Sequence, residues 1–317
     1  MARTRYAPDR GLTVRMTVTM FLLGLVFVAF VALIIGIMTA AHASAASIVL
    51  IALIFGGGGA FASLFYSDKI ALATAGARVV SPREARELHG IVDRLCAMAD
   101  MEKPTVAIAP TDLPNAFATG RNSKHAVLCV TNGLLRRLDG AELEGVLAHE
   151  MSHVAHKDVQ VMTYASLLAI VAGLLVRFAF YSELFGGGRR NSNDQNSFPI
   201  ILVIMVVSAV VYAISFLLIR LLSRYRELAA DRSAALLTGQ PSALKSALVK
   251  VSDSMAQIPT QDLRAAEPLN AFFFAPALNL RNKQKSLSAM FSTHPSLAKR
   301  IEQLDKIQHQ LGQISPE

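Results

Sequence analysis

The sequence predicts an α-helical integral membrane protein that carries an α+β domain, and three observations support this. The hydrophobic class makes up 53% of the 317 residues and Trp is absent, which is too apolar for an ordinary soluble domain. Four runs are almost free of charge and long enough to cross a bilayer, which takes about 20 helical residues. Between the second and third runs lie short β-rich segments and a helical pattern, which are typical of an α+β domain.

The net charge of +8 comes from basic residues that cluster beside the apolar runs. A nucleic-acid-binding chain would instead interleave basic and aromatic residues along a stripe, so we predict no nucleic-acid partner and attribute the basic excess to orientation in a lipid bilayer. The two cysteines, Cys96 and Cys129, form no CxxC motif. They therefore predict two buried, reduced thiols rather than a disulfide framework or a thiolate metal site.

Residues 1–67 are predicted to form an N-terminal membrane hairpin of two spans. The segments from Met16 to Ala41 and from Ser47 to Ser67 are uncharged. Ala43-Ser44-Ala45 resembles a signal-peptidase site, but the apolar run before it is about twice the usual signal core, so an uncleaved anchor is favoured. The four glycines from Gly56 to Gly59 would let two helices approach closely in lipid.

The charges that flank this hairpin predict its orientation. Arginines precede the first span, and basic residues follow the second, at Lys69, Arg78, Arg83 and Arg86. Positively charged loops stay in the cytoplasm, so residues 68–158, the first part of the α+β domain, are expected to be cytoplasmic.

The domain opens with Ser81-Pro82-Arg83-Glu84, a capping box that predicts a helix from Pro82, with apolar residues recurring at helical spacing up to Ala99. Two β-rich runs follow, from Pro104 to Ala109 and from Ala126 to Thr131. The stretch from Pro114 to Gly120 between them is predicted to be a loop. An edge of this small sheet would be able to hold an extended peptide.

The stretch His149-Glu150-Met151-Ser152-His153 carries the chemistry. Four residues make roughly 400° of rotation in a helix, so His149 and His153 lie on one face and can bind one metal ion. Glu150 lies one residue round, where it can take a proton from a metal-bound water. Asp139 and Glu142 form a capping box that predicts a helix from Gly140 to about Asp158, with no break before the next apolar run.

The alternative to a metal site is an ordinary solvated helix face, since this three-residue pattern matches by chance on the order of one time in a hundred. Val146, Leu147, Met151 and Val154 argue against it. They give the helix an apolar side, so unpaired imidazoles beside it would be unfavourable.

Residues 159–219 are predicted to form a second membrane hairpin, with spans from Val159 to Tyr181 and from Phe198 to Ile219. The polar, glycine-containing segment from Gly186 to Ser197 would be the outer turn. The arginines after the fourth span outnumber Arg189 and Arg190 in the turn, so the predicted orientation keeps the turn on the outer side. The alternative left open is that this pair lies inside the protein or at the membrane interface.

Residues 220–317 are predicted to complete the cytoplasmic domain. Glu227 and Asp231 are four residues apart, which places both carboxylates on one helix face directed at the metal helix. A helix from Gly239, a hydrophobic loop at Phe272-Phe273-Phe274 and an amphipathic helix from Pro295 to about Leu311 follow.

The chain resembles the HtpX family of bacterial membrane zinc proteases, relatives of the CAAX prenyl proteases, over nearly its whole length. The matching features are the N-terminal hairpin, Asn115 to Gly120, His149 to His153, Ser223 to Asp231, and Ser292-Thr293-His294-Pro295. The resemblance implies an α-helical integral membrane protein with an α+β gluzincin-type zinc metalloprotease domain, one Zn²⁺ per chain, and a catalytic site facing the cytoplasm from the bacterial inner membrane.

The resemblance also implies a role for individual residues. His149, His153 and Glu227 would bind the metal, Glu150 would be the catalytic base, and Asp231 would orient His149. The late His294 would stabilise the oxyanion, and the sequence alone leaves a helix-capping or surface role open for it. Asn115, Ala116 and Phe117 would contact substrate. His156 is an additional histidine near the membrane end and is not expected to be a ligand.

The function implied by the resemblance is endoproteolysis of misfolded or damaged membrane proteins, by a zinc-bound water, in quality control and the stress response. The expected partners are polypeptide substrates, the lipid bilayer and other membrane quality-control proteases. Two alternatives remain: a prenyl-protein (CAAX-type) peptidase, and a non-catalytic membrane scaffold that retains the metal. Two His and one Glu leave a coordination position for water, which disfavours the scaffold because structural zinc sites fill all four positions with protein ligands.

Overall fold

The computed structural model divides the chain into two units, each assembled from segments that are distant in sequence. Unit 1 comprises Met1–Arg15, Leu64–Gln160 and Ser223–Glu317, and unit 2 comprises Met16–Ser63 and Val161–Leu222. The residues that the structure describes are 10–40, 69, 71–120, 123–158, 161–162, 165, 172–173, 197–257 and 294–314.

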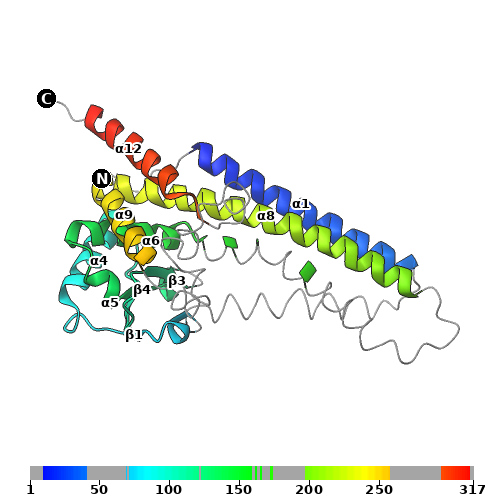
Figure 1. Ribbon diagram of the computed structural model, residues 1–317, viewed down its shortest axis with the longest axis horizontal. Coiled ribbons are helices and arrows are strands. Elements are labelled where there is room, and N and C mark those ends of the chain that lie inside the picture. Colours follow the sequence, from blue (N-terminus) through cyan, green and yellow to red (C-terminus); the bar gives the residue numbers. More distant parts are fainter. Residues whose placement is uncertain are drawn as a thin grey trace. The chain divides into compact units, whose positions relative to one another are not determined.

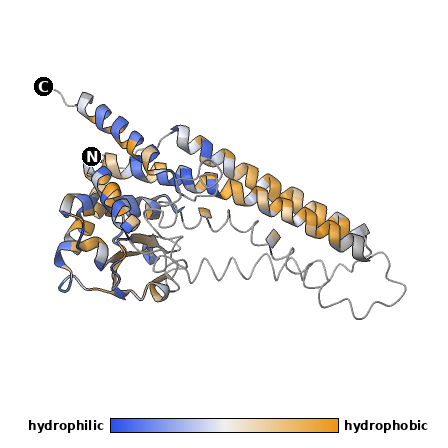
Figure 2. Ribbon diagram, viewed as in Figure 1, coloured by the Kyte–Doolittle hydropathy of each residue, from blue (hydrophilic) through white to orange (hydrophobic). Residues whose placement is uncertain are grey.

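Unit 2 contains most of α1 (Arg10–Ala40) and the first part of α8 (Ser197–Thr238), which lie side by side (Figure 1). Leu23 and Phe30 of α1 share a buried cluster with Leu222 of α8. Other large apolar side chains face outward, and Phe21 is 70% exposed. Figure 2 shows hydrophobic colouring along much of α1 and of the first part of α8, and together with the outward-facing apolar side chains this is the pattern expected where lipid rather than water surrounds them.

Two helical segments, Thr13–Ile37 and Leu202–Thr238, are long and apolar enough to cross a membrane. They overlap the first and fourth spans predicted above, although the second segment continues well beyond the predicted end at Ile219. The predicted second span, from Ser47 to Ser67, lies outside the described residues, and of the third, from Val159 to Tyr181, only residues 161–162, 165 and 172–173 are described. The assignment of the chain to two membrane hairpins therefore stays a prediction.

Unit 1 is built on a four-stranded sheet with the order β1-β2-β4-β3. Its strands are β1 (Arg78–Val79), β2 (Thr105–Ala109), β3 (Ala116–Thr119) and β4 (Val127–Thr131). The central pair, β2 and β4, is parallel, and β1 and β3 run antiparallel to their neighbours. All five residues of β4 are buried, as expected for a strand with both faces covered.

The prediction of a loop from Pro114 to Gly120 is wrong, because Ala116–Thr119 form the edge strand β3. Ala116 pairs with Val130, and Thr119 pairs with Val127. Two of its four residues are alanines, so the propensity signal of so short a segment is weak, and the strand depends on pairing and packing. The short helices α5 (Asn132–Leu135) and η2 (Ser123–His125) flank β4 in sequence.

The helix α4 (Arg86–Ala99) begins four residues later than the capping box at Ser81 predicts. The box itself is present, since Glu84 accepts hydrogen bonds from the Ser81 backbone and hydroxyl at 2.7 and 2.8 Å. These bonds, together with an ion pair from Arg78 to Glu84, stabilise a separate turn before the helix. The predicted apolar face is confirmed, with Leu88, Val92 and Leu95 buried.

The helix α6 (Gly140–Ala155) carries the predicted capping box, in which Asp139 and Glu142 bond each other's backbone N–H groups. It packs against β3, α4 and α9 (Pro241–Gln257), and α9 in turn packs against α12 (Leu297–Ile314) (Figure 1). The predicted continuation to Asp158 and beyond is wrong. The helix ends at Ala155, and Lys157 has φ 57°, a left-handed conformation that ends the helical hydrogen-bond pattern.

One hydrophobic core unites these elements of unit 1. It includes Leu95 of α4, Leu128 of β4, Leu147 and Met151 of α6, and Leu248 of α9. Both cysteines are buried and free, as predicted, and burial raises the pKa of Cys96 to about 11 and that of Cys129 to about 12. The predicted hydrophobic loop at Phe272-Phe273-Phe274 lies outside the described residues.

Candidate metal centre

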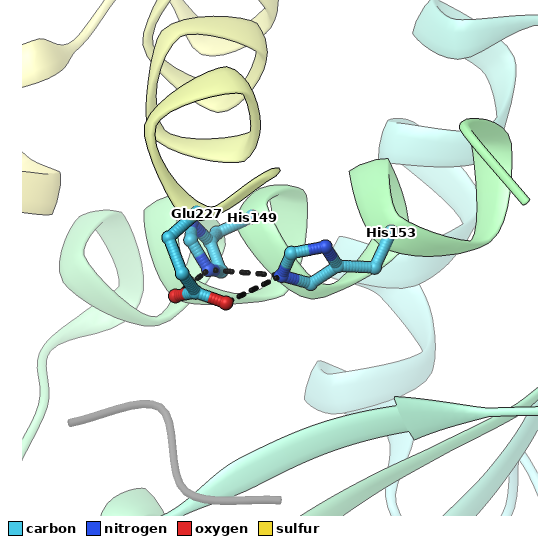
Figure 3. Close-up of side chains that lie close together, drawn as sticks. All are labelled: His149, His153 and Glu227. Carbon is cyan, nitrogen blue, oxygen red and sulfur yellow. Dashed lines mark hydrogen bonds and ion pairs between the residues drawn. The ribbon is translucent and has the colours of Figure 1, made fainter. Parts of the chain in front are cut away.

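His149, His153 and Glu227 point toward one another from two helices, α6 and α8 (Figure 3). The Nε2 atoms of the two histidines are 3.3 Å apart. Each lies 3.6 Å from a different carboxylate oxygen of Glu227. Three candidate ligand atoms within 4.8 Å of one another can surround one ion.

The opposite nitrogen of each imidazole faces a carboxylate. His149 Nδ1 lies 2.9 Å from Asp231 Oδ1, and His153 Nδ1 lies 2.5 Å from Asp158 Oδ2. A carboxylate at Nδ1 favours the tautomer with the proton there, which leaves the Nε2 lone pair directed at the site. The predicted neighbour Asp231 is thus in contact with His149, whereas Asp158 was not identified from the sequence.

Two arginines, of which Arg300 is fully buried and Arg226 partly buried, complete this set of contacts. Arg300 of α12 donates two hydrogen bonds to Asp231, at 2.6 and 2.7 Å, and its side chain is 2% exposed. Arg226, next to Glu227 on α8, lies 2.9 Å from Asp158 Oδ2. Neither was predicted. The one signal in the sequence was that Arg300 lies six residues after the singled-out His294, on a helix predicted to have one apolar face.

Glu150 is 6% exposed and lies next to His149 on α6. Its Oε2 accepts a hydrogen bond from the backbone N–H of Ala118 in β3, at 3.1 Å. Burial raises the pKa of this carboxyl, against the opposing effect of the two histidines. A carboxyl with a raised pKa, tied to the edge strand, suits proton transfer near neutral pH.

The charges around the site fit a bound cation. Four carboxylates (Glu150, Asp158, Glu227 and Asp231) are matched by two guanidinium groups (Arg226 and Arg300), which leaves two negative charges in this set when the histidines are neutral. Burial disfavours the imidazolium of His149, but Asp231 and Glu227 outweigh it and raise the pKa of His149 to about 9. An environment that attracts a proton so strongly also favours a divalent ion.

An orphaned polar atom supports the same fit. Glu227 Oε2 is buried and makes no hydrogen bond of acceptable geometry to the residues that the structure describes. A buried carboxylate oxygen without a hydrogen bond is costly, and a metal ion would compensate it. The donor set of two imidazoles and one carboxylate suits zinc in a site with an open coordination position.

His294 lies at the edge of this group, and it is 9% exposed. Its Nδ1 is 3.1 Å from Glu227 Oε2. The surface position left open from the sequence is therefore wrong for this residue. His156, by contrast, terminates α6 as its C-cap residue and is not among the three candidate ligands.

Asn115, Ala116 and Phe117 are buried at 3%, 0% and 3% exposure. The side chains of Ala116 and Phe117 belong to two hydrophobic clusters, on opposite faces of the sheet. Asn115 uses its backbone N–H and C=O to bond Thr131. Any contact of this segment with a substrate therefore has to use the backbone of the edge strand rather than the apolar side chains.

Comparison with known proteins shows which family the chain resembles. The model of peptidase family M48 matches residues 82–308. Protease HtpX homolog 1 of Streptomyces coelicolor is 58% identical over 311 residues, covering 98% of this chain and 97% of the relative. Protease HtpX homolog 2 of Methanosarcina mazei is 48% identical over 312 residues, covering 98% of this chain and 100% of the relative. The resemblance predicted from the motifs is confirmed.

The solved structures add a likeness of fold. The crystal structure of S. mikatae Ste24p matches with a TM-score of 0.52 at 18% identity, covering 94% of this chain and 67% of that chain. At this identity the likeness concerns the fold alone. It agrees with a largely helical chain that carries a small sheet, as the sequence predicted.

Proposed function

The chain belongs to peptidase family M48, and on that premise we propose that it is a membrane-embedded zinc endopeptidase of the gluzincin type that cleaves cytoplasm-exposed segments of misfolded or damaged membrane proteins. The observation that carries this proposal is the convergence of His149, His153 and Glu227 with Glu150 beside them. Such a set serves hydrolysis better than storage of a structural ion.

In this proposal each polar residue has one task. His149, His153 and Glu227 hold the zinc ion, which when bound supplies a Lewis acid that activates water and polarises the peptide carbonyl. Glu150 accepts the proton of the attacking water and passes it to the leaving amine. His294 donates a hydrogen bond to the carbonyl oxygen as negative charge develops there.

The outer edge of β3 is the proposed place for the substrate backbone. Asn115 O accepts from Thr131 N, so the odd-numbered residues of this segment direct their backbone groups toward β4. Ala116 and Ala118 direct theirs away from it, and the N–H of Ala118 meets Glu150. An extended peptide added to this edge would pass beside the proposed base.

We further propose that the protein is a multi-pass protein of the bacterial inner membrane whose catalytic unit faces the cytoplasm. The two long apolar helices and the positive-inside distribution of Arg and Lys support this. Such a location favours membrane-protein substrates and a role in quality control under stress. The alternative of a CAAX-type peptidase is separated by assaying one purified sample on a prenylated peptide and on an unfolded membrane protein.

The experiment that tests the zinc-peptidase proposal is Glu150→Gln. The amide keeps the shape of the side chain but cannot accept a proton, so casein cleavage should fall to background while one zinc ion per chain is retained. Glu144→Gln is the matched control on the same helix. Glu144 pairs with Arg94 on α4 and is not one of the candidate ligands, so its substitution should leave cleavage unchanged. Normal cleavage by Glu150→Gln would remove Glu150 as the base, and an absence of zinc in the wild-type protein would refute the zinc enzyme.

A further inference from the structure

We propose that Asp158, held by Arg226, is a positioning residue for His153, equivalent to the Asp231–Arg300 pair at His149. The proposal rests on the zinc-peptidase function above and concerns how the second imidazole is oriented. In both cases a buried carboxylate contacts Nδ1 of the histidine and an arginine from another helix contacts the carboxylate.

The contact requires the break that ends α6. On a continuous helix Asp158, five residues after His153, would lie about 140° around the axis from it and would face elsewhere. The chain instead turns at Lys157, whose φ of 57° is left-handed, and this brings the Asp158 carboxylate back to His153 Nδ1 at 2.5 Å. A left-handed backbone is unfavourable for a residue other than glycine, so a compensating interaction is expected here.

Burial makes this contact specific. Asp158 is 1% exposed, and its Oδ2 atom faces both His153 Nδ1 and Arg226 Nη2. A buried carboxylate must be paired, and an arginine pairs it without competing for the Nδ1 hydrogen. The arrangement fixes the proton of His153 at Nδ1 and turns its Nε2 toward His149 and Glu227.

Arg226 also links the Asp158 contact to the candidate ligand Glu227, because Arg226 and Glu227 are neighbours in the sequence. It precedes Glu227 directly on α8, so the same helical turn that offers a metal ligand also binds the partner of another ligand. Asp158 is the last described residue before the chain passes to unit 2, and Arg226 lies three residues after unit 1 resumes at Ser223. The ion pair thus ties the exit and the return of the chain to the metal centre.

The test measures zinc affinity of the full-length protein by competition with a chromophoric chelator, and the absorption spectrum of the cobalt-substituted protein. Asp158→Ala should weaken zinc binding about 10- to 100-fold and alter the cobalt spectrum. Asp158→Asn, which keeps the volume, should show a smaller loss and replaces Asp158→Ala if that variant does not fold. Asp305→Ala, which breaks the half-exposed ion pair with Lys245, is the control and should leave both readouts unchanged.

A double variant distinguishes positioning from simple structural pairing. If Arg226 acts through Asp158, Arg226→Ala should weaken zinc binding alone but add nothing to Asp158→Ala. Wild-type zinc affinity and cobalt spectrum in both Asp158→Ala and Asp158→Asn would overturn the proposal, and so would additive losses in the double variant. Failure of the wild-type protein to bind zinc would instead refute the proposed function, so the two failures remain distinguishable.

Discussion

At the scale of single residues, the role of each carboxylate at the metal centre follows from what it contacts. Glu227 reaches the two Nε2 atoms, where a ligand belongs, whereas Asp231 reaches Nδ1 of His149 and is bound on its other side by Arg300. Glu142, another acidic residue on α6, is occupied by Ser246 and Lys250. Contact geometry thus separates a candidate ligand from its supporting neighbours.

We predict that Glu227→Ala lowers zinc affinity and proteolysis together, because it removes a ligand. Asp231→Ala should weaken zinc affinity only about 10- to 100-fold, since it removes the orientation of His149 but no ligand. Isothermal titration of the metal-free proteins with zinc measures both. Unchanged zinc affinity in Glu227→Ala would contradict the ligand assignment.

We predict that His294→Ala lowers kcat about 100-fold while zinc is retained, the size expected when one oxyanion donor is lost. The contact of His294 Nδ1 with Glu227 at 3.1 Å suggests a competing role, in which the imidazole holds the third ligand in place. That role predicts weaker zinc binding in His294→Ala. Measuring kcat and zinc affinity on the same samples distinguishes the oxyanion role from the support of Glu227. Normal values of both quantities would exclude both roles.

The sequence predicted the site residues because helical spacing brings them together locally. His149 and His153, and likewise Glu227 and Asp231, are each four residues apart on one helix, so periodicity alone placed each pair on one face. Asp158 escaped prediction because its contact depends on a left-handed turn at a lysine, which no propensity indicates.

At the scale of elements, α6 was predictable at its N-terminus and not at its C-terminus. The capping box of Asp139 and Glu142 is a local signal, and it is present as predicted. The end at Ala155 coincides with the left-handed Lys157 and with an ion pair from Asp158 to Arg226, which joins distant parts of the chain. The same reason explains β3, whose alanines become a strand only by pairing with β4.

The first turn of α6 also provides a test of stability. Glu142 is 3% exposed, bonds the Asp139 N–H, and accepts from Lys250 and Ser246 of α9 at 2.6 Å each. We predict that Glu142→Gln destabilises the metal-free protein by about 1 to 2 kcal/mol at pH 7, as a lost charged hydrogen bond does. Apparent Tm in detergent measures it, with the exposed pair variant Glu302→Gln as the control.

The effect of Glu142→Gln should depend on pH with a definite sign. Burial alone would raise the pKa of Glu142, but Lys250, Ser246 and the Asp139 backbone outweigh burial and hold it below its ordinary value of 4.5. A carboxyl with a lowered pKa in the folded state contributes stability above about pH 4.5 and loses it as the pH falls through the folded value. The difference in Tm between wild type and Glu142→Gln should therefore be full at pH 7 and shrink below pH 4.5.

At the scale of the whole molecule, the two units alternate along the chain. Unit 1 is interrupted by unit 2 between Gln160 and Ser223, so the candidate ligands on α6 and α8 belong to one unit although a second unit intervenes in sequence. The predicted membrane hairpin would leave and return on the same side, and this would bring His153 and Glu227 together. Composition predicted such an excursion, but its extent could not be derived because apolar runs give no exact ends.

We predict that both termini and the segment from Asp68 to Asp158 are cytoplasmic, and that residues near Asn191 lie on the opposite side of the membrane. Arg220, Arg224 and Arg226 follow the apolar part of α8, and basic residues follow the first hairpin, so both flanks have the sign that remains in the cytoplasm. Because His149 and Glu227 contact each other, the segments that carry them must lie on the same side, whichever side that is.

Alkaline phosphatase fused near Asn191 should be active, whereas fusions near Gly120 and Gly239 should be inactive. Activity of the Gly120 and Gly239 fusions together would reverse the orientation and place the substrates outside the cytoplasm, and activity of only one of them would contradict the hairpin itself.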